Sequence, residues 1–215
     1  MVKLVKSILI ILLAILMVLI FNEPGPIWLF AIFLIVYLLR NPIRKTINQV
    51  LPKLSIKYFL AGFITGMFIE FLAILNNMKL PPEQRVLFHP DPIADLILGA
   101  GQYIALTVGT YFILKKCDFS IKEFFVLGGV FGLVVEQHGG ILMQLLNGNI
   151  LGGIYVFLSY SSLLAFPYML FSKDFSDFNR TKSIIPKYVI AVSILVFFYA
   201  LFLLYILLMY PLFGT

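Results

Sequence analysis

Seven long apolar stretches, separated by short polar connections, constrain the fold of this chain more than any other feature. A helix that crosses a bilayer needs about 20 mostly apolar residues, and most of these stretches approach or exceed that length. The chain is 61% hydrophobic and 12% charged, whereas a soluble domain is about a quarter charged. The sequence therefore predicts an all-α, polytopic transmembrane bundle in which residues 1–215 form one domain. We expect spans near residues 3–21, 26–40, 58–77, 93–114, 124–146, 151–171 and 187–210.

The N-terminal region, residues 1–57, is expected to form a hairpin of two spans and a segment on the inner membrane surface. Residues 3–21 resemble a signal peptide, but their apolar run is long and no A-x-A-like cleavage site follows. We therefore interpret them as a retained span. The second span is short and flanked by prolines, which leaves open whether it crosses fully. Residues 41–57 mix basic and apolar residues, a pattern typical of a surface segment.

The distribution of Lys and Arg predicts the orientation of the chain. Only Lys79 and Arg85 fall on one side of the expected spans. The other basic residues fall on the opposite side: Lys3, Lys6, Arg40, Arg44, Lys45, Lys53, Lys57, Lys115, Lys116, Lys122, Lys173, Arg180, Lys182 and Lys187. The positive-inside rule then predicts a multi-pass protein of the cell membrane with a cytoplasmic N-terminus and an outside C-terminus. The net charge of +6 is accordingly interpreted as contact with membrane lipids rather than with nucleic acid.

A Gly-x3-Gly-x3-Glu pattern occurs twice in the apolar stretches. Its copies are Gly62, Gly66 and Glu70, and then Gly128, Gly132 and Glu136. The span after each copy begins with similar residues, Ile97-Leu98-Gly99 and Ile150-Leu151-Gly152. This similarity predicts a parallel internal repeat of helix hairpins, spans 3–4 in residues 58–116 and spans 5–6 in residues 122–173, with residues 187–210 as the last span. Chance similarity between glycine-rich apolar helices is the alternative.

Glu70 and Glu136 are the strongest candidates for a functional site, because a carboxylate in hydrocarbon is costly and rare. On the fifth span, small and polar residues follow one helix face: Gly128, Gly132, Glu136, Gly140 and Gln144. Small residues let helices approach closely, so both glutamates are expected to point into the bundle. If they face each other without a cation, they must share at least one proton. In the alternative interpretation, a protonated glutamate simply bonds to a neighbouring helix.

Further polar residues are expected near the same outer half of the bundle. Asp95 shares a helix face with Gln102, whereas Asp91 followed by Pro92 indicates a helix N-cap. His138 lies about 200° round a regular helix from Glu136, so the two converge only if Gly139-Gly140 breaks the helix. The candidate catalytic residues are Glu70, Glu136, His138 and Asp95, and the candidate substrate-binding residues are Gln102, Asn76, Gln137, Gln144 and His89.

These residues predict a polar pocket that opens outward above an apolar floor. The inner half offers little beyond Thr65, Thr107, Thr110, Ser161 and Ser162. The aromatic residues occur in every span, and we interpret them as lipid-facing and packing residues. No HExxH, GxGxxG, Walker or G-x-S-x-G motif is present, and the sequence requires no cofactor. A divalent metal held by His and carboxylate ligands is compatible with the sequence but not favoured.

The first functional hypothesis is an enzyme that does acid/base chemistry on a lipid or isoprenoid, with the paired carboxylates as acid and base. The second is a proton- or cation-coupled transporter of small solutes, for which parallel repeats and intramembrane acids are typical. The third is a non-catalytic subunit of a membrane complex. A homodimer or contacts with other membrane subunits would suit any of the three. A polar lining that reaches Thr65 and Thr110 would favour the transporter, and a sealed floor the enzyme.

Overall fold

The computed structural model describes residues 2–20 and 25–213, and within these ranges the side chains of residues 2–4, 6, 84, 137 and 138 lie outside the description. The described chain is all-helical, as its composition predicts. Its helices are α1 (Val2–Ile20), α2 (Trp28–Val50), α3 (Leu54–Asn77), α4 (Pro92–Lys116), α5 (Ile121–Val135), α6 (Gly140–Leu146), α7 (Ile150–Phe171) and α8 (Ile184–Met209). Short 3-10 turns follow several of them: η1 (Pro82–Gln84), η2 (Glu136–Gly139), η3 (Ser172–Phe175) and η4 (Tyr210–Phe213).

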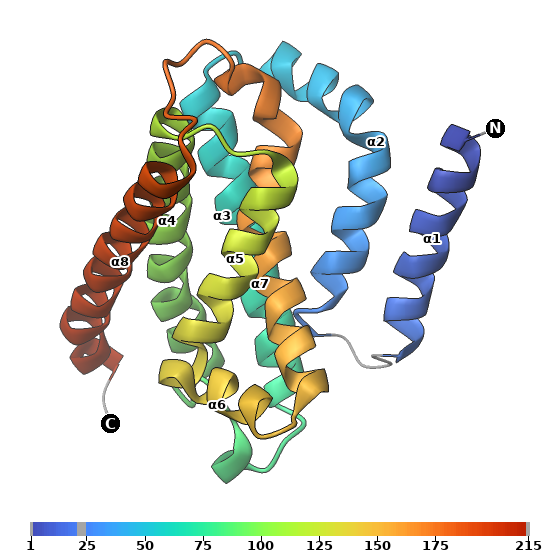
Figure 1. Cartoon of the computed structure of the whole chain (residues 1–215). Coiled ribbons are helices and arrows are strands. Elements are labelled where there is room, and N and C mark those ends of the chain that lie inside the picture. The colour runs from blue at the N-terminus through green and yellow to red at the C-terminus, as the bar shows by residue number, and fades with distance from the viewer. Residues whose placement is uncertain (1, 21–24, 214–215) are drawn as a thin grey trace.

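Successive long helices run in alternate directions, so the connections gather at two ends of the bundle (Figure 1). We call the end that holds α6 and the connection between α3 and α4 the α6 end, and the opposite end the basic end. Helices α3, α4, α5 and α7 form the centre, while α8 packs on α4 and α1 packs on α2. Most of the basic residues that the sequence places on the inner side lie on connections and helix ends at the basic end, for example Lys116 and Lys122.

Four helical segments are long and apolar enough to cross a membrane: Leu54–Asn77, Pro92–Lys116, Ile150–Phe175 and Ile184–Phe213. The pair formed by α5 and α6 gives a fifth if it counts as one crossing. Of the two N-terminal spans expected from the sequence, the first coincides with a shorter apolar helix, Ser7–Ile20, within α1. The structure therefore supports a helical membrane protein with four to five candidate spans.

Helix α2 extends farther than the expected span of residues 26–40. It continues through Pro42 to Val50, and Figure 1 shows its last part turning across the basic end of the bundle. Proline removes a backbone hydrogen bond and bends a helix without necessarily ending it. Residues 41–50 are consequently helical, and only residues 51–53 separate α2 from α3.

The expected continuous helix of residues 124–146 is wrong, because the chain breaks at η2. Helices α5 and α6 meet at an angle of 99°. Gly139 has a φ of +84°, a left-handed conformation that glycine adopts without the strain of a Cβ atom. The stripe expected on one helix face thus stops at Glu136. Gly140 and Gln144 belong to α6, which runs in a different direction.

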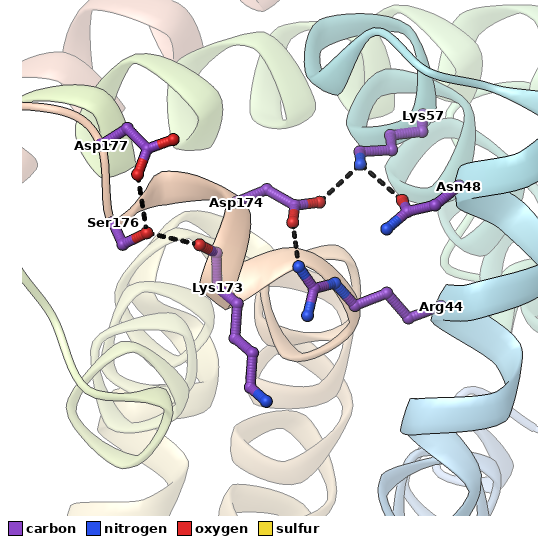
Figure 2. A network of polar contacts seen from close by, with 7 residues as sticks. All are labelled: Arg44, Asn48, Lys57, Lys173, Asp174, Ser176 and Asp177. Carbon is purple, nitrogen blue, oxygen red and sulfur yellow. Dashed lines mark hydrogen bonds and ion pairs between the residues drawn. The ribbon is translucent and has the colours of Figure 1, made fainter.

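Charged side chains close the basic end. Asp174 of η3 forms ion pairs with Arg44 of α2 and with Lys57 of α3, at 2.5 Å for the latter (Figure 2). Lys57 also donates a hydrogen bond of 2.6 Å to Asn48. Two further ion pairs join Lys187 to Glu123 and Arg180 to Asp118. The basic partners of these ion pairs, Arg44, Lys57, Arg180 and Lys187, are among the residues that the sequence places on the inner side.

Candidate functional site

A chamber of about 310 Å³ lies toward the α6 end of the bundle, and both Glu70 and Glu136 line it. Its walls come from α3, α4, α5, α7 and α8, from the connection before α4, and from Pro26 before α2. The remaining lining residues are Ile69, Ala73, Val86, Leu87, Phe88, Gln102, Tyr103, Val135, Tyr155, Val156, Ser159, Tyr160, Leu163, Tyr199 and Phe202. The fold thus brings two acids that are far apart in the sequence to one largely apolar space.

Glu70 is held by a tyrosine from the neighbouring helix. The hydroxyl of Tyr103 in α4 donates a hydrogen bond of 2.5 Å to Oε2 of Glu70 in α3. One turn before Glu70, Gly66 faces the same ring, and a Cβ atom at this glycine would lie 2.3 Å from Cγ of Tyr103. The ring can therefore reach the carboxylate only because residue 66 has no side chain.

Glu136 is held in the same manner by α7. The hydroxyl of Tyr160 donates a hydrogen bond of 2.7 Å to Oε2 of Glu136, and a Cβ atom at Gly132 would lie 2.4 Å from Cγ of Tyr160. Gln102 of α4 donates a hydrogen bond of 3.4 Å to the Tyr160 hydroxyl, which connects the two helix pairs. Each copy of the Gly-x3-Glu pattern thus forms a glycine–tyrosine–glutamate arrangement.

The acid that interacts most strongly with Glu70 is Asp95 rather than Glu136. The carboxyl group of Glu70 lies against Gly99 of α4, one turn after Asp95, and the two acids interact electrostatically. Oδ1 of Asp95 accepts hydrogen bonds from the backbone N–H groups of Phe88 at 2.6 Å and His89 at 3.0 Å. Oδ2 is buried and has no hydrogen-bonding partner among the described residues. Two interacting carboxyl groups can bond to each other only through a proton, so we expect this pair to share one.

His89 folds over the α6 end instead of remaining in solvent. Its ring packs against Tyr210 and Phe213, with ring centroids 5.6 and 6.0 Å away. Its Nδ1 accepts a hydrogen bond of 3.0 Å from the backbone N–H of Asp91. Asp91 caps α4 as its sequence predicts, accepting from Ile93 and Ala94. His89 therefore lies at the α6 end of the site but is not among the residues that line the chamber.

The structure does not bring every candidate residue to the chamber. Gln102 lines it, but Asn76 and Gln144 do not. Asn76 lies half-buried beside Gly25, and Gln144 is exposed and accepts a hydrogen bond of 3.1 Å from Asn149. The side chains of Gln137 and His138 lie outside the described part of the structure, although the helix break needed to bring His138 near Glu136 is present.

Tyr103, Tyr160 and Ser159 are among the lining residues that the sequence analysis missed. Treating the aromatic residues only as packing groups is wrong for both tyrosines, whose hydroxyls hold the acids. A buried tyrosine hydroxyl needs a partner, so a tyrosine midway along a span that also carries Gln102 was a usable signal. Nothing in the sequence distinguishes Ser159 from the neighbouring Ser161 and Ser162.

The floor of the chamber is packed, and the hydroxyls of Thr65 and Thr110 are satisfied locally. Thr65 and Thr110 do not line the chamber. The hydroxyl of Thr65 donates to the carbonyl of Ala61 at 2.6 Å, and that of Thr110 to the carbonyl of Thr107 at 3.1 Å. Closer to the basic end, Tyr58 and Phe175 are fully buried and their rings pack against each other. The polar lining thus ends well before the basic end.

The polar side chains of the chamber are carboxylates, tyrosines, one amide and one serine. Within residues 2–20 and 25–213, no group of three or more His, Cys, Asp or Glu side chains is arranged to hold a metal ion. Cys117 is buried and free, outside the chamber. The residues therefore fit proton exchange and ligand binding better than coordination of a transition metal.

Comparison with known proteins gives no guide to the chemistry of this chamber. No protein-family model, curated protein or solved structure matches the chain, so its function must be inferred from the site itself.

Proposed function

We propose that this chain is an integral membrane enzyme that does acid/base chemistry on a lipid-like or isoprenoid-like molecule in the chamber. The observation that carries this proposal is that Glu70 and Glu136 line one apolar space and occupy different environments. Glu70 faces Asp95 and Tyr103, whereas Glu136 has Tyr160 as its hydrogen-bonding partner. Two carboxyl groups in unequal surroundings can serve as acid and base.

In this proposal the pair of Glu70 and Asp95 supplies the proton, since it holds one between two carboxyl groups. Glu136 accepts a proton from the substrate, with the Tyr160 hydroxyl fixing one of its oxygens at 2.7 Å. Gln102 orients the substrate or the Tyr160 hydroxyl. The apolar walls exclude water from the reacting group, which strengthens each polar interaction in the chamber.

The membrane arrangement is part of the proposal. Seven crossings with a cytoplasmic N-terminus would place the basic end inside and the chamber near the outer surface, as the positive-inside rule predicts. The alternating helix directions support this arrangement. The two glycine–tyrosine–glutamate arrangements support a parallel repeat, in which Tyr160 has the same contacts as Tyr103 but lies one helical turn later than the position that matches Tyr103 in sequence.

A proton- or cation-coupled transporter is the second candidate, because those two equivalent arrangements lie on two hairpins that could move relative to each other. The packed floor favours the enzyme. The third hypothesis, a non-catalytic subunit, loses its main support, since the glycines expected to bind partner helices pack inside this chain. Gly62 and Gly66 contact α4, and Gly128 and Gly132 contact α7.

Deuterium exchange tests the proposal. Membranes that contain the protein are incubated with a total lipid extract in D2O, and lipids are examined by mass spectrometry for deuterium at carbon. We expect incorporation with the wild type and at least about a hundredfold less with Glu70→Gln or Glu136→Gln, the usual contribution of a general acid or base. Glu83→Gln, an exposed acid at the same end, is the matched control.

The outcomes separate the candidates. Equal incorporation in wild-type and both glutamine variants would overturn the enzyme. Solute flux into sealed vesicles without chemical change, lost in both variants, would establish the transporter instead.

A further inference from the structure

The chamber is lined by acidic side chains without a basic side chain to balance them. Glu70 and Glu136 line it, and the described lining residues include no Lys, Arg or His. Glu70 is 6% exposed and Asp95 fully buried, so a carboxylate that stays ionised on either of them has little contact with water. A buried charge is costly unless an opposite charge or a proton compensates it. Apart from a proton, a bound cation is the partner that could compensate such a charge in this chamber.

Aromatic side chains form a large part of the chamber wall. Six aromatic side chains line it: Phe88, Tyr103, Tyr155, Tyr160, Tyr199 and Phe202. The face of an aromatic ring carries partial negative charge and attracts ammonium groups, most strongly where water is excluded. Carboxylates between aromatic walls are the surroundings that an organic ammonium group prefers, and they disfavour anions.

Ser159 gives a second and independent indication of a ligand. Its residue is only 4% exposed, it lines the chamber, and its Oγ has no hydrogen-bonding partner within the described residues. A buried hydroxyl without a partner is uncommon in a folded protein and carries a desolvation cost. A polar group of a bound molecule would satisfy it.

We infer that the chamber binds an organic monocation, an amphiphile whose ammonium group sits beside Glu136 between the aromatic rings and whose neighbouring polar group bonds to Ser159. The inference rests on the proposed function, since it names the substrate class of the same site. The volume of about 310 Å³ suits such a head group with a short apolar part, and ligand pockets of this size are at the small end of the usual range. An organic cation fits better than a metal ion, because the rings offer contact surface but few ligand atoms.

Three probes of nearly equal shape test the inference: choline, its neutral carbon isostere 3,3-dimethylbutan-1-ol, and the anion 3,3-dimethylbutanoate. Dissociation constants are measured by calorimetry on the whole protein in an uncharged maltoside detergent. We expect choline to bind about tenfold more tightly than the neutral isostere, and the anion to bind most weakly.

Variants locate the preference within the chamber. Glu136→Gln should bring the ratio between choline and the alcohol close to one, and Tyr199→Leu should lower it about threefold. Glu83→Gln should leave it unchanged. If Glu136→Gln fails to fold, the ratio in the wild type and in Tyr199→Leu still decides. Equal binding of the alcohol, tighter binding of the anion, or an unchanged ratio in Glu136→Gln would overturn the inference.

The two experiments distinguish failure of this inference from failure of the proposed function. Deuterium incorporation without a preference for choline would leave the enzyme standing and remove the organic cation. A preference for choline without deuterium incorporation would retain the cation site and remove the acid/base chemistry.

Discussion

Acidic side chains lie at both ends of the bundle, but their charges are compensated differently. At the basic end, Asp174 lies between Arg44 and Lys57, and Glu123 pairs with Lys187. In the chamber, Glu70 and Glu136 receive hydrogen bonds from tyrosines, and no basic side chain is among the described lining residues. The first arrangement satisfies its charges within the chain and connects α2, α3 and η3. The second leaves charge to be met by a proton or a ligand.

This difference teaches where stability and function reside. A buried ion pair is severely damaged when one partner is removed, because the remaining charge is uncompensated. A carboxyl group held only by neutral donors or by another carboxyl group tolerates neutralisation, because its neutral amide can keep most hydrogen bonds. The two ends should therefore respond in opposite ways to the loss of an acidic charge.

The largest effect is expected at the basic end. Asp174→Asn would leave Lys57, which is 5% exposed, without its ion-pair partner. We expect a loss of about 3 kcal/mol in the free energy of unfolding, measured by SDS titration of the purified protein. The control is Asp177→Asn in the same segment, an exposed residue that bonds only to Ser176 in Figure 2, which should change stability by less than about 0.5 kcal/mol. Equal stability of the two variants would contradict the assigned role of Asp174.

An intermediate loss of stability is expected at the glycines against which the tyrosine rings pack. Gly66→Ala and Gly132→Ala place a methyl group against the rings of Tyr103 and Tyr160, and each should cost about 1–3 kcal/mol in the free energy of unfolding. Gly109→Ala in α4 serves as the control. Its Cβ would lie 3.1 Å from the ring of Phe198, a contact that a small shift relieves. Stability that is unchanged in both variants would show that the rings can leave the acids freely.

The smallest effect is expected at the shared proton. Asp95→Asn keeps an oxygen for the N–H groups of Phe88 and His89, and its amide N–H can donate to Glu70 in place of the proton. The free energy of unfolding should therefore change by less than about 1 kcal/mol. Asp95→Leu removes the acceptor and should cost about 2 kcal/mol or more. If the Asn variant is as unstable as the Leu variant, the two carboxyl groups do not share a proton.

Local sequence patterns were sufficient for much of the fold. The apolar run of residues 58–77 predicts most of α3, because in lipid only a helix satisfies its own backbone groups. Asp91 followed by Pro92 predicts the start of α4, and the side chain caps the helix there. Ser120 and Glu123 form a capping box whose spacing could also have been read from the sequence.

The site was only partly predictable, because its contacts join distant helices. The repeated pattern singled out Glu70 and Glu136, and both line the chamber. No local pattern predicts that Asp95 meets Glu70, or that Asp174 meets Arg44 and Lys57. These pairings depend on the direction in which each side chain leaves its helix and on how closely the helices approach.

The sequence by itself determined the helices, their apolar character and the two acids that hydrocarbon makes costly, since these depend on composition and spacing along one element. The tertiary structure alone decided the break at Gly139 and the tyrosines that hold the acids. Two adjacent glycines permit a break without requiring it, and packing against neighbouring helices selects the conformation. The partner of a buried polar group is likewise chosen by which helix lies opposite, a choice that no single helix encodes.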